Sequence, residues 1–199
     1  MKKLKVIIDN GHGCNTPGKR SPDGSLLEWK YTREIAMRVM VELIAHGVDA
    51  ERIVKEDIDI SLPERCRRAN KIYKDSNGNS ILVSIHLNAA GNGEWMNAHG
   101  WEIWTSVGQT KSDILADHIA IAAAKELPGV KIRTDMSDGD VDKESGFYIL
   151  KNTLCPAVLT ENLFQDNKIE VGFLLSEEGK QKIVDLHVNG ILDYLKSAK

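Results

Sequence analysis

Short apolar runs alternate along this chain with longer stretches of helical periodicity, and this alternation constrains the fold more than any other feature of the sequence. The apolar runs are rich in β-branched residues and are bounded by polar or turn-forming residues, which is typical of strands. Six runs are predicted to be strands: Leu4–Asp9, Arg52–Val54, Ser80–His86, Gly100–Thr105, Phe147–Leu150 and Ala157–Thr160.

The stretches between these runs carry helix signals. Ser61 is predicted to cap one helix, since Glu64 follows three residues later. Other helices are predicted over Ser25–His46, Lys111–Leu127 and Ser176–Ala198. Strands that alternate with helices predict the α/β class, with a mostly parallel sheet of about six strands covered by helices on both faces. No repeat or linker interrupts this pattern, so residues 1–199 are predicted to form a single domain.

The composition is that of an ordinary soluble protein. The chain has 199 residues, of which 42% are hydrophobic and 28% are charged, and this length suits one domain with a sizeable core. The net charge of -3 gives no support to nucleic-acid binding. No apolar run approaches the ~18 residues that a membrane span needs. The apolar stretch at the N-terminus is too short for a signal peptide, which predicts synthesis in the cytoplasm without Sec export.

The cysteines argue against a disulfide framework or a cysteine zinc site. There are three of them, Cys14, Cys66 and Cys155, and no C-x-x-C motif is present. Free thiols are therefore predicted. The basic segment ERCRRANK, residues 64–71, is interpreted as a solvated helix face.

Polar residues stand at the ends of three predicted strands. His12 follows the first strand, His86 ends the run at 80–86 with Asn88 just beyond it, and Glu161 follows Ala157–Thr160. Open α/β sheets bind their ligands at the carboxyl ends of the strands. These side chains are therefore predicted to meet at one edge of the sheet.

Glu28 is a fourth candidate, near the start of the helix predicted over Ser25–His46. It shares one helical stripe with Thr32, Ile35 and Val39, so it is predicted to face the sheet. An inward carboxylate is costly unless it is paired or binds a metal. The alternative is a surface glutamate that the helix dipole stabilises.

Two histidines and a carboxylate are a common ligand set of catalytic zinc sites, in which the fourth position is open to water. Zinc lowers the pKa of that water toward ~7. A further carboxylate must take up the proton and pass it on, and Glu161 is the candidate. Gly11 and Gly13, on either side of His12, are predicted to let the backbone bend sharply and to leave open space at the metal.

Several segments, in order over nearly the whole chain, resemble the zinc-dependent N-acetylmuramoyl-L-alanine amidases of the amidase-3 family. They are VIIDNGHG, the helix with Glu28, SIHLNAA and GFYILKNTLCPAVLTENLF with the segment after it. The resemblance implies a twisted sheet between helices, one Zn²⁺ held by His12, Glu28 and His86, and a catalytic Glu161. The implied reaction is hydrolysis of the amide between N-acetylmuramic acid and L-alanine in peptidoglycan.

The sequence departs from the family pattern at Asn10, where Asp or Pro is more usual, and at Leu163, where glycine is common. Neither change removes an implied ligand. Some relatives carry an inserted helix that blocks the zinc until a partner removes it, and the loops here are too short for it, so no obligatory activator is expected. No wall-binding module is seen in residues 1–199. Together with the missing export signal, this resembles phage lysins and predicts a lysin-like domain that acts on the cell wall. The chain is expected to be a monomer.

Other functions stay open from the residues alone. A zinc peptidase that cuts within the stem peptide needs the same metal and base. A non-catalytic peptidoglycan-binding domain with a degenerate site is a second alternative. A phosphate-binding protein that uses NGHG as an anion nest is a third, although no P-loop lysine is present.

The long loop over residues 90–100 holds candidates for substrate contacts. Trp95 offers an aromatic face that suits a sugar ring, whereas Trp101 and Trp104 are predicted to pack in the sheet. His99, on the same loop, and Asn88, at the strand end before it, are the other candidates.

Overall fold

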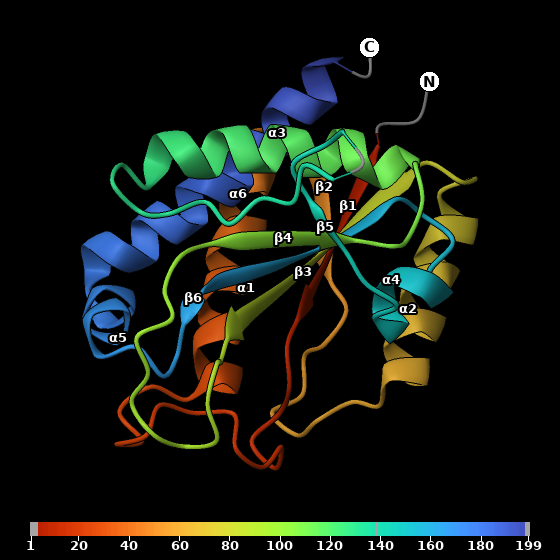
Figure 1. The fold of residues 1–199 in the computed structure, drawn as a ribbon. Coiled ribbons are helices and arrows are strands. Elements are labelled where there is room, and N and C mark those ends of the chain that lie inside the picture. Colours follow the sequence, from red (N-terminus) through yellow and green to blue (C-terminus); the bar gives the residue numbers. More distant parts are fainter. Residues whose placement is uncertain (1–3, 138, 198–199) are drawn as a thin grey trace.

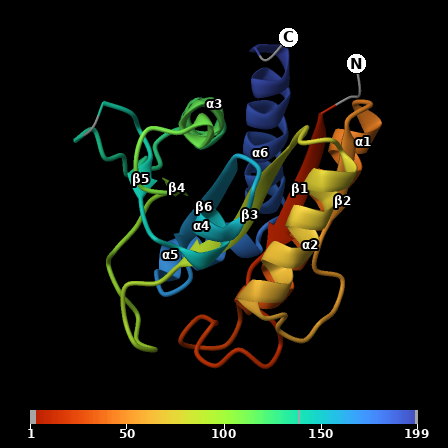
Figure 2. The same ribbon diagram turned by 90° about the vertical axis from the view of Figure 1, so that its right-hand side faces the viewer.

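The structure is a computed structural model that describes residues 4–137 and 139–197. Its centre is a six-stranded sheet with the strand order β2-β1-β3-β6-β4-β5 (Figures 1 and 2). β2, β1, β3 and β6 run parallel to one another, whereas β4 is antiparallel to β6 and parallel to β5. The predicted α/β fold with a mostly parallel sheet is confirmed. The strands are β1 (Lys5–Asn10), β2 (Asp49–Arg52), β3 (Ser80–Asn88), β4 (Glu102–Thr105), β5 (Lys143–Glu144) and β6 (Ala157–Phe164).

Helices cover both faces of the sheet, as the alternation predicts (Figure 2). One face packs against α1, α3 and α6, and the other packs against α2 and α4. Successive residues of a strand point to opposite faces of the sheet. Val6 and Ile8 of β1 belong to the core with α1, α3 and α6, and Ile7 belongs to the core with α2 and α4. The helices are α1 (Glu28–Ala45), α2 (Leu62–Asp75), α3 (Lys111–Glu126), α4 (Tyr148–Asn152), α5 (Lys168–Leu175) and α6 (Glu177–Ser197).

The prediction of a strand over Phe147–Leu150 is wrong, because most of this run lies in the short helix α4. Ile149 and Leu150 are both buried, although they are adjacent, so burial here does not alternate as it does along a half-buried strand. A short apolar run carries too little periodicity to separate a strand from a buried helical turn. The strand β5 and the helix α5 lie in segments for which no element was predicted.

Element ends also differ from the predictions. β2 ends at Arg52, where the predicted strand began, and Ile53 and Val54 are buried just beyond it. Ser61 is the N-cap residue of α2, but its side chain makes no capping hydrogen bond. The last helix ends at Ser197, and residue 198 of its predicted range lies outside the described residues.

The described residues bear on membrane spans and on disulfides. None of the helices there has the length and apolar character that a bilayer crossing requires. The three cysteines are free thiols, as predicted: Cys14 is exposed, and Cys66 and Cys155 are buried.

His187 ties α6 to the strand that carries Glu161. The Thr160 hydroxyl lies 2.9 Å from His187 Nε2, and His187 Nδ1 lies 2.7 Å from the carbonyl oxygen of Ile183. The imidazole is fully buried, and this burial lowers its pKa to about 4. His187 is therefore a neutral core residue at pH 7.

Acid is expected to destabilise the fold through His187. The unfolded chain keeps the ordinary histidine pKa of about 6.5, so below this pH protons bind the unfolded state more tightly. The contribution of His187 to the free energy of unfolding is therefore fully present above pH 6.5. It falls by at most about 1.4 kcal/mol per pH unit as the pH drops toward 4. Urea unfolding at pH 7.5 and pH 5 measures the loss, and His187→Gln is expected to reduce it. An equal loss in the variant would contradict this role.

Candidate metal centre

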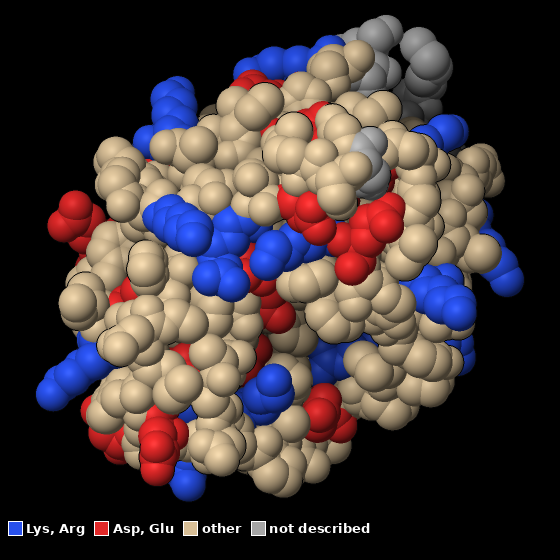
Figure 3. Space-filling model, in the orientation of Figure 1, with Lys and Arg blue, Asp and Glu red and all other residues tan. Residues whose placement is uncertain are grey.

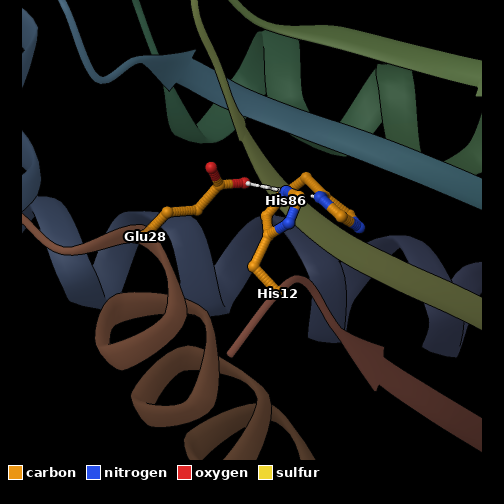
Figure 4. Close-up of side chains that lie close together, drawn as sticks. All are labelled: His12, Glu28 and His86. Carbon is orange, nitrogen blue, oxygen red and sulfur yellow. Dashed lines mark ion pairs between the residues drawn. The ribbon is translucent and has the colours of Figure 1, made fainter. Parts of the chain in front are cut away.

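Three side chains from separate elements meet at the carboxyl end of β1 and β3. Glu28 Oε1 lies 3.4 Å from His12 Nε2 and 3.4 Å from His86 Nδ1. One potential ligand atom from each residue lies within 4.8 Å of the others. Figure 4 shows the Glu28 side chain reaching from the start of α1 toward the two imidazole rings. The predicted convergence of these three residues is thus present in the structure.

Glu28 is fully buried, as the helical stripe predicted. Its Oε1 accepts a hydrogen bond from the backbone N–H of Leu87 at 3.0 Å, and its Oε2 accepts one from Gln165 Nε2 at 3.1 Å. Gln165 was not predicted as a site residue. It follows Glu161 on β6 by four positions, and nothing in the local pattern indicates that it turns back toward α1.

The protonation states of the cluster suit a cation. Burial acts to raise the pKa of Glu28, but contact with His86 and the nearby His12 outweigh it, so its pKa lies below the ordinary value. Burial lowers the pKa of His12 to about 4, which leaves this ring neutral at pH 7. Burial acts to lower the pKa of His86 too, but Glu28 and Glu161 outweigh it and raise it. The cluster is a buried carboxylate that attracts one positive charge, either a proton on His86 or a metal ion.

Glu161 lies beside this cluster. It is the register partner of His86 across the β3–β6 ladder. Burial raises its pKa to about 8, and its Oε2 is a buried atom without a hydrogen-bond partner among the described residues. An unpartnered buried carboxyl oxygen is unusual in a structural role, because it costs free energy.

A bulge in β6 follows Glu161. The pairing advances by two residues on β3, from His86 to Asn88, and by three on β6, from Glu161 to Phe164. Leu163 lies in this bulge with a left-handed φ of 68° and joins the α1–α3–α6 core at 1% exposure. Glycine adopts that φ at little cost, which explains why glycine suits this position. The leucine contributes core packing instead.

The sequence interpretation of the two glycines beside His12 needs correction. The left-handed residue is His12 itself, with φ of 58°, and neither glycine has a positive φ. The glycines are needed for close packing. A Cβ on Gly11 would lie 2.5 Å from the His86 ring, and one on Gly13 would lie 1.9 Å from the backbone nitrogen of Asp59.

Two arginines hold the backbone of His12 in this conformation. The His12 carbonyl oxygen accepts hydrogen bonds from Arg33 Nη2 at 3.0 Å and from Arg65 Nη2 at 3.1 Å. Arg65 also donates to the Asp9 carboxylate at 2.7 Å and to the Asn10 carbonyl at 2.6 Å. Arg65 is only 2% exposed, so the interpretation of residues 64–71 as a solvated helix face is wrong for this residue. The neighbouring Arg67, with a side chain 67% exposed, fits that interpretation.

Comparison with known proteins shows which family the chain belongs to. A family model described as N-acetylmuramoyl-L-alanine amidase matches residues 6–193. The chain belongs to the amidase-3 family. The resemblance found in the sequence is thereby confirmed.

Individual members of the family match this amidase-3 chain over most of its length. An endolysin of Bacillus phage SPP1 is 28% identical over 200 residues, which cover 100% of this chain and 68% of the endolysin. The N-acetylmuramoyl-L-alanine amidase CwlM of Bacillus licheniformis is 30% identical over 195 residues, which cover 94% of this chain and 67% of CwlM. A solved N-acetylmuramoyl-L-alanine amidase from Clostridium difficile 630 gives a TM-score of 0.80 at 29% identity, with 99% of both chains covered.

The other predicted site residues of this amidase-3 chain, Asn88, Trp95 and His99, are not members of the cluster. Asn88 ends β3, two residues beyond His86. Trp95 is 37% exposed, and His99 is exposed with Nδ1 at 3.1 Å from the Asn97 carbonyl. The loop that carries Trp95 is tied to the end of β6, because Asp166 accepts hydrogen bonds from the backbone of residues 90 and 91. Trp101, fully buried, is confirmed as a packing residue.

Proposed function

We propose that this chain is a zinc-dependent N-acetylmuramoyl-L-alanine amidase, which hydrolyses the amide between N-acetylmuramic acid and L-alanine in peptidoglycan. Membership of the amidase-3 family supports the reaction. The observation that carries the metal dependence is the cluster of His12, Glu28 and His86, with its buried carboxylate between two imidazoles.

The donor set fits one Zn²⁺. Two imidazole nitrogens and one carboxylate oxygen are ligands that zinc prefers, and a set of three leaves a position open for catalysis. The side chains of His12 and His86 are 20% and 17% exposed, so solvent and substrate reach the cluster. Zinc bound there would supply Lewis-acid chemistry, making water nucleophilic at neutral pH and polarising the scissile carbonyl.

Glu161 would move the proton. Its carboxylate takes a proton from the attacking water and delivers it to the leaving amide nitrogen, so the carbonyl carbon gains oxygen while the carbon–nitrogen bond breaks. The products are the lactyl carboxylic acid on the glycan and a stem peptide with a free L-alanine amine. The raised pKa of Glu161 favours the protonated form that donates, and a nearby divalent cation would lower that pKa and favour the form that accepts.

Mass spectrometry of muropeptides treated with the purified protein tests this function. The expected products are free stem peptides that begin at L-alanine, lost with a chelator and restored by zinc. Shortened peptides still attached to muramic acid would show a peptidase instead. Bound zinc without any product would favour the non-catalytic peptidoglycan-binding alternative.

Arg65→Lys is expected to weaken zinc binding by about 10–100-fold, as changes in groups that orient metal ligands typically do. Lysine keeps the charge near Asp9 but cannot reach the carbonyls of Asn10 and His12 at once, as Arg65 does. Competition with a chromophoric chelator measures the affinity. Arg67→Lys, two positions further along α2, is the matched control. Equal zinc affinity in Arg65→Lys and the wild type would exclude a positioning role.

Access to the cluster supports an enzyme that needs no activator. No helix lies in the segments that border it, residues 11–27, 53–61 and 89–101. We propose that the purified chain acts alone on the cell wall as a monomer, like a lysin, with Asn88, Trp95 and His99 along the substrate groove. Activity that appears only with an added partner protein would refute this proposal.

A further inference from the structure

A row of side chains crosses the sheet from the candidate metal centre to β4. His86 on β3 pairs in register with Glu161 on β6, and Glu161 pairs with Glu102 on β4. Register partners project on the same face, and neighbouring strands lie about 4.8 Å apart. Glu102 therefore stands one strand from Glu161 and two strands from His86.

Glu102 forms ion pairs with two cationic side chains, Arg133 and Lys143. It is 2% exposed, and its Oε1 accepts from Arg133 Nε and from Lys143 Nζ, the latter at 3.0 Å. Arg133 and Lys143 form no other ion pair with a described residue. Glu102 is thus the carboxylate in direct contact with both cations, whereas Asp135 and Glu170 act on Lys143 and Arg133 only at longer range.

The two cations keep hydrogen-bonding capacity on the solvent side. Their side chains are 32% and 21% exposed. A guanidinium has five N–H donors and an ammonium has three, so most of these donors remain available after the bonds to Glu102. Figure 3 shows Lys and Arg side chains gathered at the centre of the face that it draws, next to a hollow in which acidic side chains are visible.

Packing holds both cations in place. The Arg133 guanidinium lies 5.2 Å from the ring centre of Phe164, and Lys143 Nζ lies 5.1 Å from that of Trp104. The backbone of Arg133 donates to the Trp101 carbonyl at 2.8 Å. A Cβ on Gly100 would lie 3.1 Å from Arg133 Cγ, so the glycine leaves room for the arginine stem. Because these contacts already restrict both side chains, less side-chain conformational entropy is lost when a ligand binds.

We propose that Arg133 and Lys143 form an anion subsite for a carboxylate of the stem peptide, on the peptide side of the scissile amide. This inference rests on the proposed amidase function. The stem peptide is acidic, whereas the N-acetylated sugars are uncharged, so charge complementarity assigns the peptide to this side of the centre. An extended peptide advances about 3.3–3.6 Å per residue, so a carboxylate on its second residue reaches β4 when the scissile bond lies beside Glu161.

Two synthetic muramoyl tripeptides test the subsite, one with a free α-carboxylate on the second peptide residue and one with a carboxamide there. The wild type is expected to show a kcat/KM about tenfold higher on the carboxylate substrate, since a charge-assisted hydrogen bond supports a discrimination of that order. Arg133→Gln is expected to lower this ratio at least about threefold. Glu102→Gln keeps both cations, removes the balancing charge and is expected to raise the ratio.

Lys125→Gln, an exposed lysine of α3 away from this row, is the charge-matched control and is expected to leave the ratio unchanged. Equal rates on the two substrates, or equal ratios in the wild type and Arg133→Gln, would overturn the subsite. If the zinc-loaded wild type cleaves neither substrate, the proposed function fails instead. Calorimetric binding of the two free tripeptides then decides the subsite alone, because an equal affinity for both would exclude it.

Discussion

Glu161→Gln is expected to lower kcat by about 10²–10⁴-fold, the range that general acid–base groups contribute. The amide has nearly the same shape as the carboxyl group but cannot accept or deliver a proton at this position. Glu161 is not one of the three residues whose ligand atoms cluster, so one zinc per chain is expected to remain. The measurement is the rate of stem-peptide release together with the zinc content of the same sample.

Glu178→Gln, an exposed change in the first turn of α6, serves as the control for loss of one carboxylate. It is expected to retain the wild-type rate. If Glu161→Gln kept a rate near that of the wild type, Glu161 would not be the proton carrier. Loss of zinc from Glu161→Gln would instead make this residue a ligand.

His86→Ala is expected to lose both the zinc and the activity. The change removes one of three ligands and leaves Glu28 buried with His12 as its single remaining ring partner. Zinc content after dialysis, measured by atomic emission, is expected to fall from one equivalent to near zero. The exposed His46→Ala variant, at the end of α1, controls for removal of an imidazole.

The His86 ring packs against Gly11, so its removal also opens space at the sheet edge. Thermal unfolding of the metal-free proteins separates this effect from ligand loss. His86→Gln, which fills more of the space, is expected to lose zinc as well. A folded His86→Ala protein that still binds one tight zinc would rule out His86 as a ligand.

The alternation of strands and helices predicted the architecture because each element must bury an apolar face against the sheet. Long periodic segments such as α1 and α6 were located to within a few residues. The failure at Phe147–Leu150 has a physical origin, since the contacts of Ile149 and Leu150 with α2 and β6 decide between strand and helix there. Those contacts are distant in sequence and leave no local pattern.

The candidate site residues were predictable where a polar side chain stands at the carboxyl end of a strand. His12, His86 and Glu161 stand near the carboxyl ends of neighbouring parallel strands, so the sheet itself brings them together. The groups that orient them were not predictable. Arg65 belongs to a charged helical segment and Gln165 to a turn, and only the folded chain shows that both point inward.

Titration of Zn²⁺ into the metal-free protein, followed by the rate of stem-peptide release, tests whether the reaction depends on one bound zinc. Activity is expected to be absent without metal, to rise linearly with added zinc and to reach its plateau at one equivalent of zinc per chain. Full activity of the metal-free protein in the presence of a chelator would contradict this dependence on zinc.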